Sequence, residues 1–212
     1  MPMNFSSFSK LPLLGILRGV KGFNIEPIAK ICTSTGLQAI EITMNTEGAK
    51  ELISQMKYFA QGNFSVGAGT VLTYKDLDAA IGAGAEFIVM PSLQVEVMRI
   101  CVSQNIPVFP GAFTPTEIYK AWDLGATMVK VFPSSLLGPS YFKEIKGPLD
   151  SVKLLACGGV SEHTIAHYFS HGADAAAFGA SVFKPEWLLA ENYSAIEKSI
   201  QTLMQAYFVA RK

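Results

Sequence analysis

Short apolar runs alternate with stretches of helical periodicity along the whole chain, and this alternation restricts the fold more than any other sequence feature. Eight apolar runs have the length of β-strands, at Leu13–Leu17, Ala39–Thr43, Phe64–Gly67, Phe87–Met90, Pro107–Phe109, Met128–Phe132, Val152–Ala156 and Ala175–Phe178. Helical spacing falls between them, at Ile25–Thr35, Ala49–Phe59, Tyr74–Ile81, Val95–Ser103, Thr116–Leu124, Tyr141–Ile145 and Thr164–Ser170. Strands that alternate with helices are typical of parallel sheets. Eight such repeats predict a (β/α)8 barrel, a TIM barrel, with a short N-terminal helix.

Residues that begin and end helices support the same repeats. Candidate N-cap residues precede four helices, at Asn24, Thr73, Thr114 and Ser161, and glycines follow four helices, at Gly36, Gly84, Gly125 and Gly172. No linker divides the chain, so we expect one domain over residues 1–212. An open doubly wound sheet is the alternative. Its Gly-x-Gly-x-x-Gly fingerprint is absent after the first strand, and Gly67-Ala68-Gly69-Thr70 lacks the third glycine.

The balance of charges limits the classes of partner. The chain has 17 basic and 17 acidic residues, so its formal net charge is zero. Such a chain has no broad attraction for nucleic acid or for an anionic membrane, and no apolar run reaches membrane-spanning length. The three cysteines, Cys32, Cys101 and Cys157, form no zinc pattern with the histidines, so we expect no metal site. Free thiols are typical of a reducing cytoplasm.

Lys130 lies inside the apolar run of the sixth predicted strand. Lysine is rarely buried unless it is paired or used. Desolvation lowers the pKa of an ammonium group, so a buried lysine can supply the neutral amine that Schiff-base chemistry needs. Glu41 interrupts the second predicted strand in the same way. The two residues are therefore candidates for a nucleophile and its acid/base partner, and the alternative is a structural ion pair between two strands.

The strand register brings further charged and polar groups to one end of the predicted barrel. The active sites of such barrels lie at the carboxyl ends of the strands, where Arg18, Glu41 and Lys130 are all found. Because side chains alternate between the two faces of a strand, Lys130 shares a face with Phe132, and Glu41 with Thr43. If these faces point inward, an amine, a carboxylate and a guanidinium group converge at the barrel mouth.

Glycine-rich loops follow the last two predicted strands, where barrel enzymes frequently bind phosphate. The candidate phosphate-binding residues are Gly158, Gly159 and Val160 in the first loop, and Gly179, Ala180 and Ser181 in the second. Glycines expose backbone N–H groups, and each loop precedes a predicted helix whose N-terminus favours negative charge. The alternative interpretation is that both loops are ordinary turns.

Five motifs occur together and in order: Arg18, Glu41-Ile42-Thr43, Gly67-Ala68-Gly69-Thr70-Val71, Lys130-Val131-Phe132-Pro133 and Gly158-Gly159-Val160. They resemble the class I aldolases of 2-keto-3-deoxy-6-phosphogluconate, which act in the Entner–Doudoroff route. The resemblance implies a homotrimeric (β/α)8 lyase that needs neither a metal nor a cofactor. It also implies that Lys130 is the Schiff-base lysine and that Glu41 is the general acid/base.

The same resemblance implies a substrate and the residues around it. The substrate is a phosphorylated keto acid, which is cleaved to pyruvate and glyceraldehyde 3-phosphate, and members often also cleave 4-hydroxy-2-oxoglutarate. Arg18 and Thr70 match positions near the pyruvate carboxylate. Phe132 and Pro91 match residues that pack beside it.

Two positions depart from the gluconate-type pattern. Many such members have Pro-Thr before the paired glycines, where this chain has Ala156-Cys157, and some carry an arginine where Asn45 stands. Asn45, Ser134-Ser135 and Gly138-Pro139 resemble the branch that acts on the 6-phosphogalactonate epimer. Cys157 and Asn45 are therefore candidate specificity residues, and the preferred epimer stays open.

Two other functions fit a barrel with these residues. A phosphosugar isomerase or epimerase would use Glu41 and Lys130 as bases without a covalent intermediate. A phosphometabolite-binding barrel would have no catalytic role, but it would have little reason to keep a buried lysine.

Overall fold

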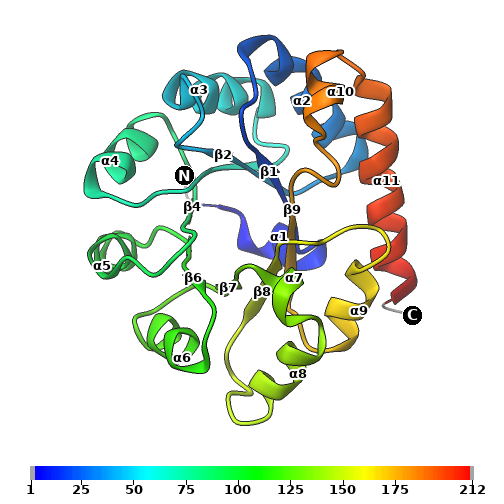
Figure 1. Cartoon of the computed structure of the whole chain (residues 1–212). Helices are drawn as coiled ribbons and strands as arrows, with labels where there is room; N and C mark the ends of the chain where they lie inside the picture. The colour runs from blue at the N-terminus through cyan, green and yellow to red at the C-terminus, as the bar shows by residue number, and fades with distance from the viewer. Residues whose placement is uncertain (1–2, 211–212) are drawn as a thin grey trace.

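Parallel strands form a barrel with helices around its outside in the computed structural model of this chain, which describes residues 3–210 (Figure 1). The strands are β1 (Leu13–Leu17), β2 (Ala39–Thr43), β3 (Ser65–Gly69), β4 (Ile88–Val89), β5 (Val108–Phe109), β6 (Gly111–Ala112), β7 (Val129–Val131), β8 (Leu154–Cys157) and β9 (Ala175–Phe178). The helices are α1 (Phe5–Lys10), α2 (Gly22–Thr35), α3 (Ala49–Ala60), α4 (Tyr74–Gly82), α5 (Val95–Ser103), α6 (Pro115–Asp123), α7 (Ser134–Leu137), α8 (Ser140–Lys146), α9 (Ile165–Ser170), α10 (Pro185–Leu189) and α11 (Tyr193–Ala210).

The barrel has eight strand positions, and the fifth is interrupted at Pro110. The strand order is β5-β4-β3-β2-β1-β9-β8-β7-β6, and every pair is parallel. β5 and β6 stand at opposite ends of this order but are separated in the chain by Pro110 alone, which has no N–H to continue a ladder. The Pro110 carbonyl accepts a hydrogen bond from the N–H of Lys130 at 2.9 Å. The predicted barrel fold is therefore confirmed.

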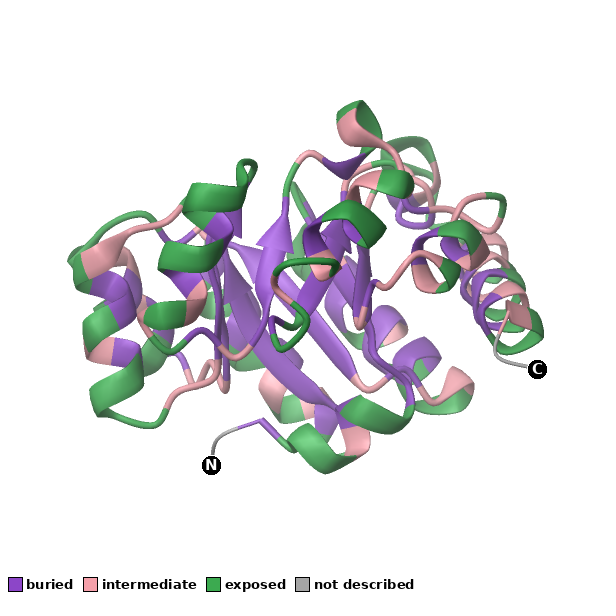
Figure 2. Ribbon diagram, turned by 90° about the horizontal axis from the view of Figure 1, so that it is seen from below, coloured by how far each residue is buried: buried purple, intermediate pink, exposed green. Residues whose placement is uncertain are grey.

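A compact set of side chains fills the inside of the barrel. It includes Leu14, Phe87, Phe109 and Leu155, which belong to one buried cluster separate from the larger cluster between strands and helices. The predicted N-terminal helix, α1, lies across one end of the barrel, and its Phe8 packs edge-on against Phe109 at 6.2 Å between ring centroids (Figures 1 and 2). That end is therefore closed by apolar side chains, and the opposite end remains open to a ligand.

The helix ends agree only in part with the sequence prediction. The side chains of Thr73 and Thr114 cap α4 and α6 as expected. Asn24 lies three residues inside α2, where its side chain accepts from the N–H of Lys21, and Thr164 rather than Ser161 is the N-cap residue of α9. The four predicted glycines, Gly36, Gly84, Gly125 and Gly172, all have the positive φ that ends a helix.

β3 differs from the prediction in a way that matters for the site. The sequence predicts a strand at Phe64–Gly67, whereas the observed strand is Ser65–Gly69. Gly69 is therefore a strand residue opposite Thr43 of β2, and its side of the strand faces the barrel interior. Within residues 3–210, no helix is both long enough and apolar enough to cross a membrane.

Candidate active site

Lys130 is the central residue of β7 and points into the barrel. Its neighbours across the ladder are Gly111 of β6 and Leu155 of β8. The residue is 6% exposed, and its Nζ lies 5.2 Å from the ring centroid of Phe132, two residues further along the same face. The amine is thus held on a rigid strand against an aromatic ring. This is the environment that the sequence predicted for a nucleophilic lysine.

Glu41 of β2 points into the same space and is 1% exposed. Among residues 3–210, its Oε2 is the one fully buried side-chain polar atom without a hydrogen-bond partner. Burial raises the pKa of the Glu41 carboxyl above its ordinary value, while the positive charges of Lys130 and Arg18 oppose this shift. No ion pair within 4.0 Å joins Glu41 to Lys130 in the described part of the chain. The structural ion pair considered from the sequence is therefore not formed.

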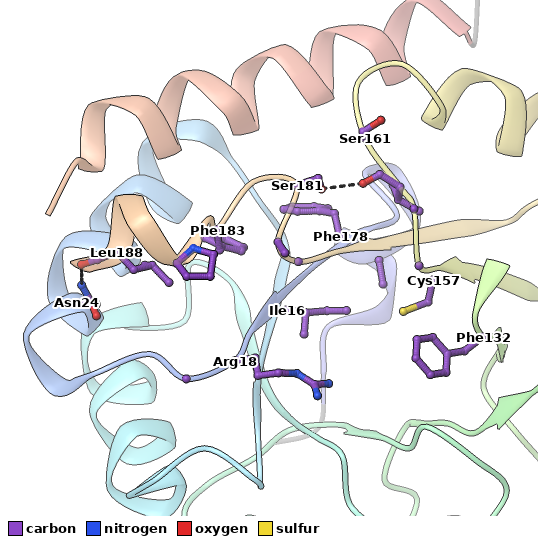
Figure 3. A pocket seen from close by; sticks show the side chains of 18 of the residues that line it. Ile16, Arg18, Asn24, Phe132, Cys157, Ser161, Phe178, Ser181, Phe183 and Leu188 are labelled. Carbon is purple, nitrogen blue, oxygen red and sulfur yellow. Dashed lines mark hydrogen bonds between the residues drawn. The ribbon is translucent and has the colours of Figure 1, made fainter. Parts of the chain in front are cut away.

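Arg18 follows β1 at the open end of the barrel. Its side chain extends toward the region of Phe132 and Cys157 (Figure 3), and its charge acts on the Glu41 carboxyl. The next residue, Gly19, donates its N–H to the hydroxyl of Thr46 at 3.0 Å, and that hydroxyl lies 2.9 Å from the hydroxyl of Thr43. These bonds fasten the end of β1 to the end of β2. Arg18 is thereby placed at the same end of the barrel as Glu41.

Cys157 ends β8, lines the cavity at this end of the barrel and lies near Lys130. Its thiol is 3% exposed, and burial raises its pKa, while the nearby Lys130 charge partly opposes that shift. The Cys157 N–H donates to the hydroxyl of Ser134 at 3.0 Å, and Ser134 donates to the carbonyl of Val131 at 2.7 Å. Ser134 therefore links the ends of β7 and β8.

A cavity of about 700 Å³ opens at this end of the barrel (Figure 3). Its lining contains nine predicted site residues: Arg18, Phe132, Cys157, Gly158, Gly159, Val160, Gly179, Ala180 and Ser181. Lys130 and Glu41 are not part of the lining. They lie deeper in the barrel, next to Cys157, whose thiol pKa responds to both charges. The two predicted groups of residues, acid/base and phosphate-binding, thus adjoin each other.

The two glycine-rich loops lie side by side in this cavity. Ser181 donates its hydroxyl to the carbonyl of Val160 at 2.7 Å, and Thr164 donates to the carbonyl of Gly159 at 2.7 Å. Within the described residues, the backbone N–H groups of Gly159, Val160, Ala180 and Ser181 donate no hydrogen bond. Uncommitted N–H groups around a cavity can bind an anion.

The helices that follow these loops do not begin directly at the loop residues. α9 starts at Ile165 and α10 at Pro185, so each loop is followed first by a turn. In the second loop, Phe183 donates its N–H to the carbonyl of Gly179, which closes one helical turn. Anion binding here would therefore depend on local N–H groups rather than on the dipole of a helix.

Besides Lys130 and Glu41, three further predicted residues lie outside the cavity lining. Thr70 directly follows β3 with φ of 56° and is half-buried. Pro91 is half-buried after β4, and its carbonyl approaches Gly111 so closely that a Cβ there would overlap it. Asn45 is exposed in the turn after β2. The predicted roles of these three residues in binding substrate stay predictions.

The far wall of the cavity contains none of the predicted site residues. Phe183, Pro185, Leu188 and Leu189 line it together with Lys21 and Asn24. Asn24 is buried and donates its side-chain amide to the carbonyl of Leu188 at 3.0 Å, which fixes α10 against α2. A polar residue at the start of an apolar helical pattern is the signal available in the sequence, and the prediction that Asn24 is an N-cap residue is wrong, because Lys21 holds that position.

Comparisons with known proteins agree on one family. A family model described as KDPG and KHG aldolase matches residues 6–199. A probable 2-dehydro-3-deoxy-6-phosphogalactonate aldolase of Rhizobium meliloti (strain 1021) is 35% identical over 175 residues, which is 82% of each chain. A 2-dehydro-3-deoxy-6-phosphogalactonate aldolase of Escherichia coli (strain K12) is 33% identical over 177 residues, 83% of this chain and 86% of that protein. A solved native KDPGal structure has a TM-score of 0.89 at 30% identity, covering 95% of this chain and 97% of that one.

Proposed function

The chain belongs to the KDPG and KHG aldolase family, and from this premise we propose that it is a Schiff-base aldolase of a phosphorylated 2-keto-3-deoxy acid. The substrate is 2-keto-3-deoxy-6-phosphogluconate, its galactonate epimer, or both, and the products are pyruvate and glyceraldehyde 3-phosphate. The single observation that carries this proposal is a buried amine, Lys130, beside a buried carboxyl, Glu41, that makes no ion pair with it. 4-Hydroxy-2-oxoglutarate is a second expected substrate.

The proposed reaction begins at the amine. Neutral Lys130 attacks the C2 carbonyl of the substrate, and loss of water gives an iminium ion. Glu41 transfers protons in these steps and then accepts the proton of the C4 hydroxyl. The C3–C4 bond breaks, its electron pair enters the iminium system as an enamine, and the aldehyde leaves. The enamine is protonated at C3, and hydrolysis then releases pyruvate and Lys130.

The rest of the site would bind the two charged ends of the substrate. Arg18 balances the carboxylate, and Thr70, Pro91 and Phe132 surround the pyruvate half. The phosphate is bound by the loops of Gly158, Gly159 and Val160 and of Gly179, Ala180 and Ser181. The uncommitted N–H groups of four of these residues support that role. In this proposal, the substrate must be long enough for its C2 carbonyl to reach Lys130 while its phosphate lies at the glycine loops.

The preferred epimer depends on the wall that faces the C4 hydroxyl. Cys157 forms part of the cavity wall next to Lys130, and a thiol is a much weaker hydrogen-bonding group than a hydroxyl. We propose that Cys157 and Asn45 permit both epimers, with some preference for galactonate. The galactonate names of the two relatives above support this preference.

The assembly and location follow from the resemblance. We propose a homotrimer in the cytoplasm. The three cysteines, Cys32, Cys101 and Cys157, are buried free thiols, which supports a reducing compartment. Sedimentation measures the assembly directly, and a stable monomer would remove the trimer from the proposal.

Trapping with borohydride tests the proposed function. Pyruvate plus borohydride should label the protein irreversibly, and a peptide map should locate the label at Lys130. Omitting pyruvate is the control, because reduction without an iminium ion leaves no label. Label at another residue, or none, would contradict the Schiff-base mechanism and favour an isomerase or epimerase.

A further inference from the structure

The inner face of β3 carries almost no side chain. Ser65, Gly67 and Gly69 share this face, because successive residues of a strand point to opposite sides. Neither glycine has a positive φ, so the backbone conformation itself accepts any residue. The reason for glycine must therefore be the space that each one leaves empty.

The two empty spaces are filled by different neighbours. A Cβ at Gly67 would lie 2.5 Å from Cδ2 and Cζ of the Phe87 ring, which belongs to the inner apolar core. A Cβ at Gly69 would overlap Oε1 of Glu41 and lie 2.6 Å from its Cδ. The first glycine thus makes room for core packing. The second makes room for the carboxyl group that the proposed mechanism uses.

The strand register shows how far the Glu41 side chain leans. The neighbour of Glu41 across the ladder is Gly67, yet its carboxyl lies over Gly69, the next inward position toward the open end. The carboxyl is thereby turned toward the site, where the charges of Arg18 and Lys130 act on it. Because its Oε2 has no hydrogen-bond partner, packing against the bare strand has to fix this direction.

We propose that Gly69 is a positioning residue for the aldolase reaction. Because Gly69 has no side chain, the Glu41 carboxyl can lie in the space that a larger residue at position 69 would fill. The catalytic part of this proposal rests on the proposed function; the placement of the carboxyl does not. A methyl group at position 69 would displace a flexible side-chain end rather than backbone, so the Gly69→Ala protein should fold. Glu41 would then meet the substrate protons at a poorer distance and angle.

The test compares Gly69→Ala with Gly67→Ala, which adds the same methyl group on the same face but meets Phe87. Two readouts follow the chemistry: borohydride trapping of pyruvate, and exchange of the pyruvate methyl protons with deuterated water. Gly69→Ala should still be labelled at Lys130 but should exchange protons about 10-fold to 100-fold more slowly, within the range of general acid–base effects. Gly67→Ala should lower thermal stability and keep the exchange rate of the folded protein within about twofold.

A double-mutant cycle separates positioning from a general structural effect. If Gly69 acts through Glu41, then Gly69→Ala should cause no further loss in a Glu41→Gln background. Losses that multiply would overturn the proposal, and so would a Gly69→Ala protein that exchanges protons at the wild-type rate.

The pKa of Glu41, measured by NMR of a protein with carbon-13 in its glutamate carboxyls, gives a readout that needs no catalysis. Gly69→Ala should change this pKa, and Gly67→Ala should not. If wild-type protein forms no adduct with pyruvate, the proposed function fails. The titration still tests whether Gly69 determines the environment of the Glu41 carboxyl. An unchanged pKa in Gly69→Ala would overturn the positioning role.

Discussion

The Lys130 amine and the Glu41 carboxyl lie inside one barrel, close enough for the lysine charge to oppose the raised pKa of the carboxyl, yet no ion pair within 4.0 Å joins them. Two charges buried without a direct pair cost folding free energy. A site that must bind a substrate between an amine and an acid/base group requires such a separation. The buried Oε2 of Glu41 has no hydrogen-bond partner among the described residues, as expected if the carboxyl serves the proton transfer proposed above.

Replacing Glu41 by glutamine should slow turnover while the amine still reacts. Proton transfer by a positioned side chain contributes roughly 10²–10⁴-fold to the rate, so Glu41→Gln should lower kcat by about that factor. Borohydride trapping of pyruvate on Lys130 should remain detectable, although slower. An unfolded variant, or a folded one with wild-type turnover, would instead assign Glu41 a structural role.

The same variant should be more stable than wild type at neutral pH. The folded pKa of Glu41 is raised, so the folded state binds its proton more tightly than the unfolded state does, and stability falls as pH rises from the unfolded pKa through the folded one. Glu41→Gln removes this loss, worth about 1.4 kcal/mol for each unit of the pKa difference. Urea unfolding at pH 4 and pH 8 measures it. The gain should be larger at pH 8, and an equal effect at both values would contradict the shift.

Lys130→Arg should abolish activity without unfolding the protein. A lysine amine can lose its proton and attack a carbonyl carbon, but a guanidinium group does not lose its proton in the range where enzymes work. Nucleophilic attack on a carbonyl group would therefore stop. Circular dichroism provides the control for folding, and aldol cleavage by a folded Lys130→Arg protein would show that the amine is not the nucleophile.

The phosphate loops should matter only for phosphorylated substrates. Ser181→Ala removes the hydrogen bond that joins the two loops through the carbonyl of Val160. Loss of such a bond costs about 0.5–1.5 kcal/mol, so kcat/KM for the phosphorylated acid should fall about 2-fold to 13-fold relative to that for 4-hydroxy-2-oxoglutarate. Inorganic phosphate should compete with the phosphorylated acid, and its failure to do so would count against this pocket.

Cys157→Thr should shift the ratio of kcat/KM values toward the gluconate epimer. A threonine hydroxyl can hydrogen-bond one configuration of a substrate hydroxyl, whereas an apolar wall discriminates by only ~1–3 kcal/mol. Assays of both epimers with wild type and variant give the ratio. If the ratio stays the same, Cys157 is a packing residue.

The sequence by itself determined the repeating strands and helices and the two charged residues inside apolar strands. Both signals are local. A run of neighbouring apolar residues predicts a buried strand, and Lys130 and Glu41 each interrupt a run only a few residues long. The family resemblance added the expected roles of Arg18 and the glycine loops. The barrel fold is confirmed, and the roles of Arg18, Lys130, Glu41 and the glycine loops stay predictions.

Only the tertiary structure decided what lies beside each of these residues. Contacts between strands depend on register, and one residue of shift turns a side chain to the other face. Three features of the site depend on contacts between residues distant in sequence. They are the contact of the Glu41 carboxyl with Gly69, the hydrogen bond of Ser134 between β7 and β8, and the cavity wall at Leu188. The motif Gly67-Ala68-Gly69 therefore helped to indicate the family, but the reason for its two glycines lies in Phe87 and Glu41, which only the fold brings next to them.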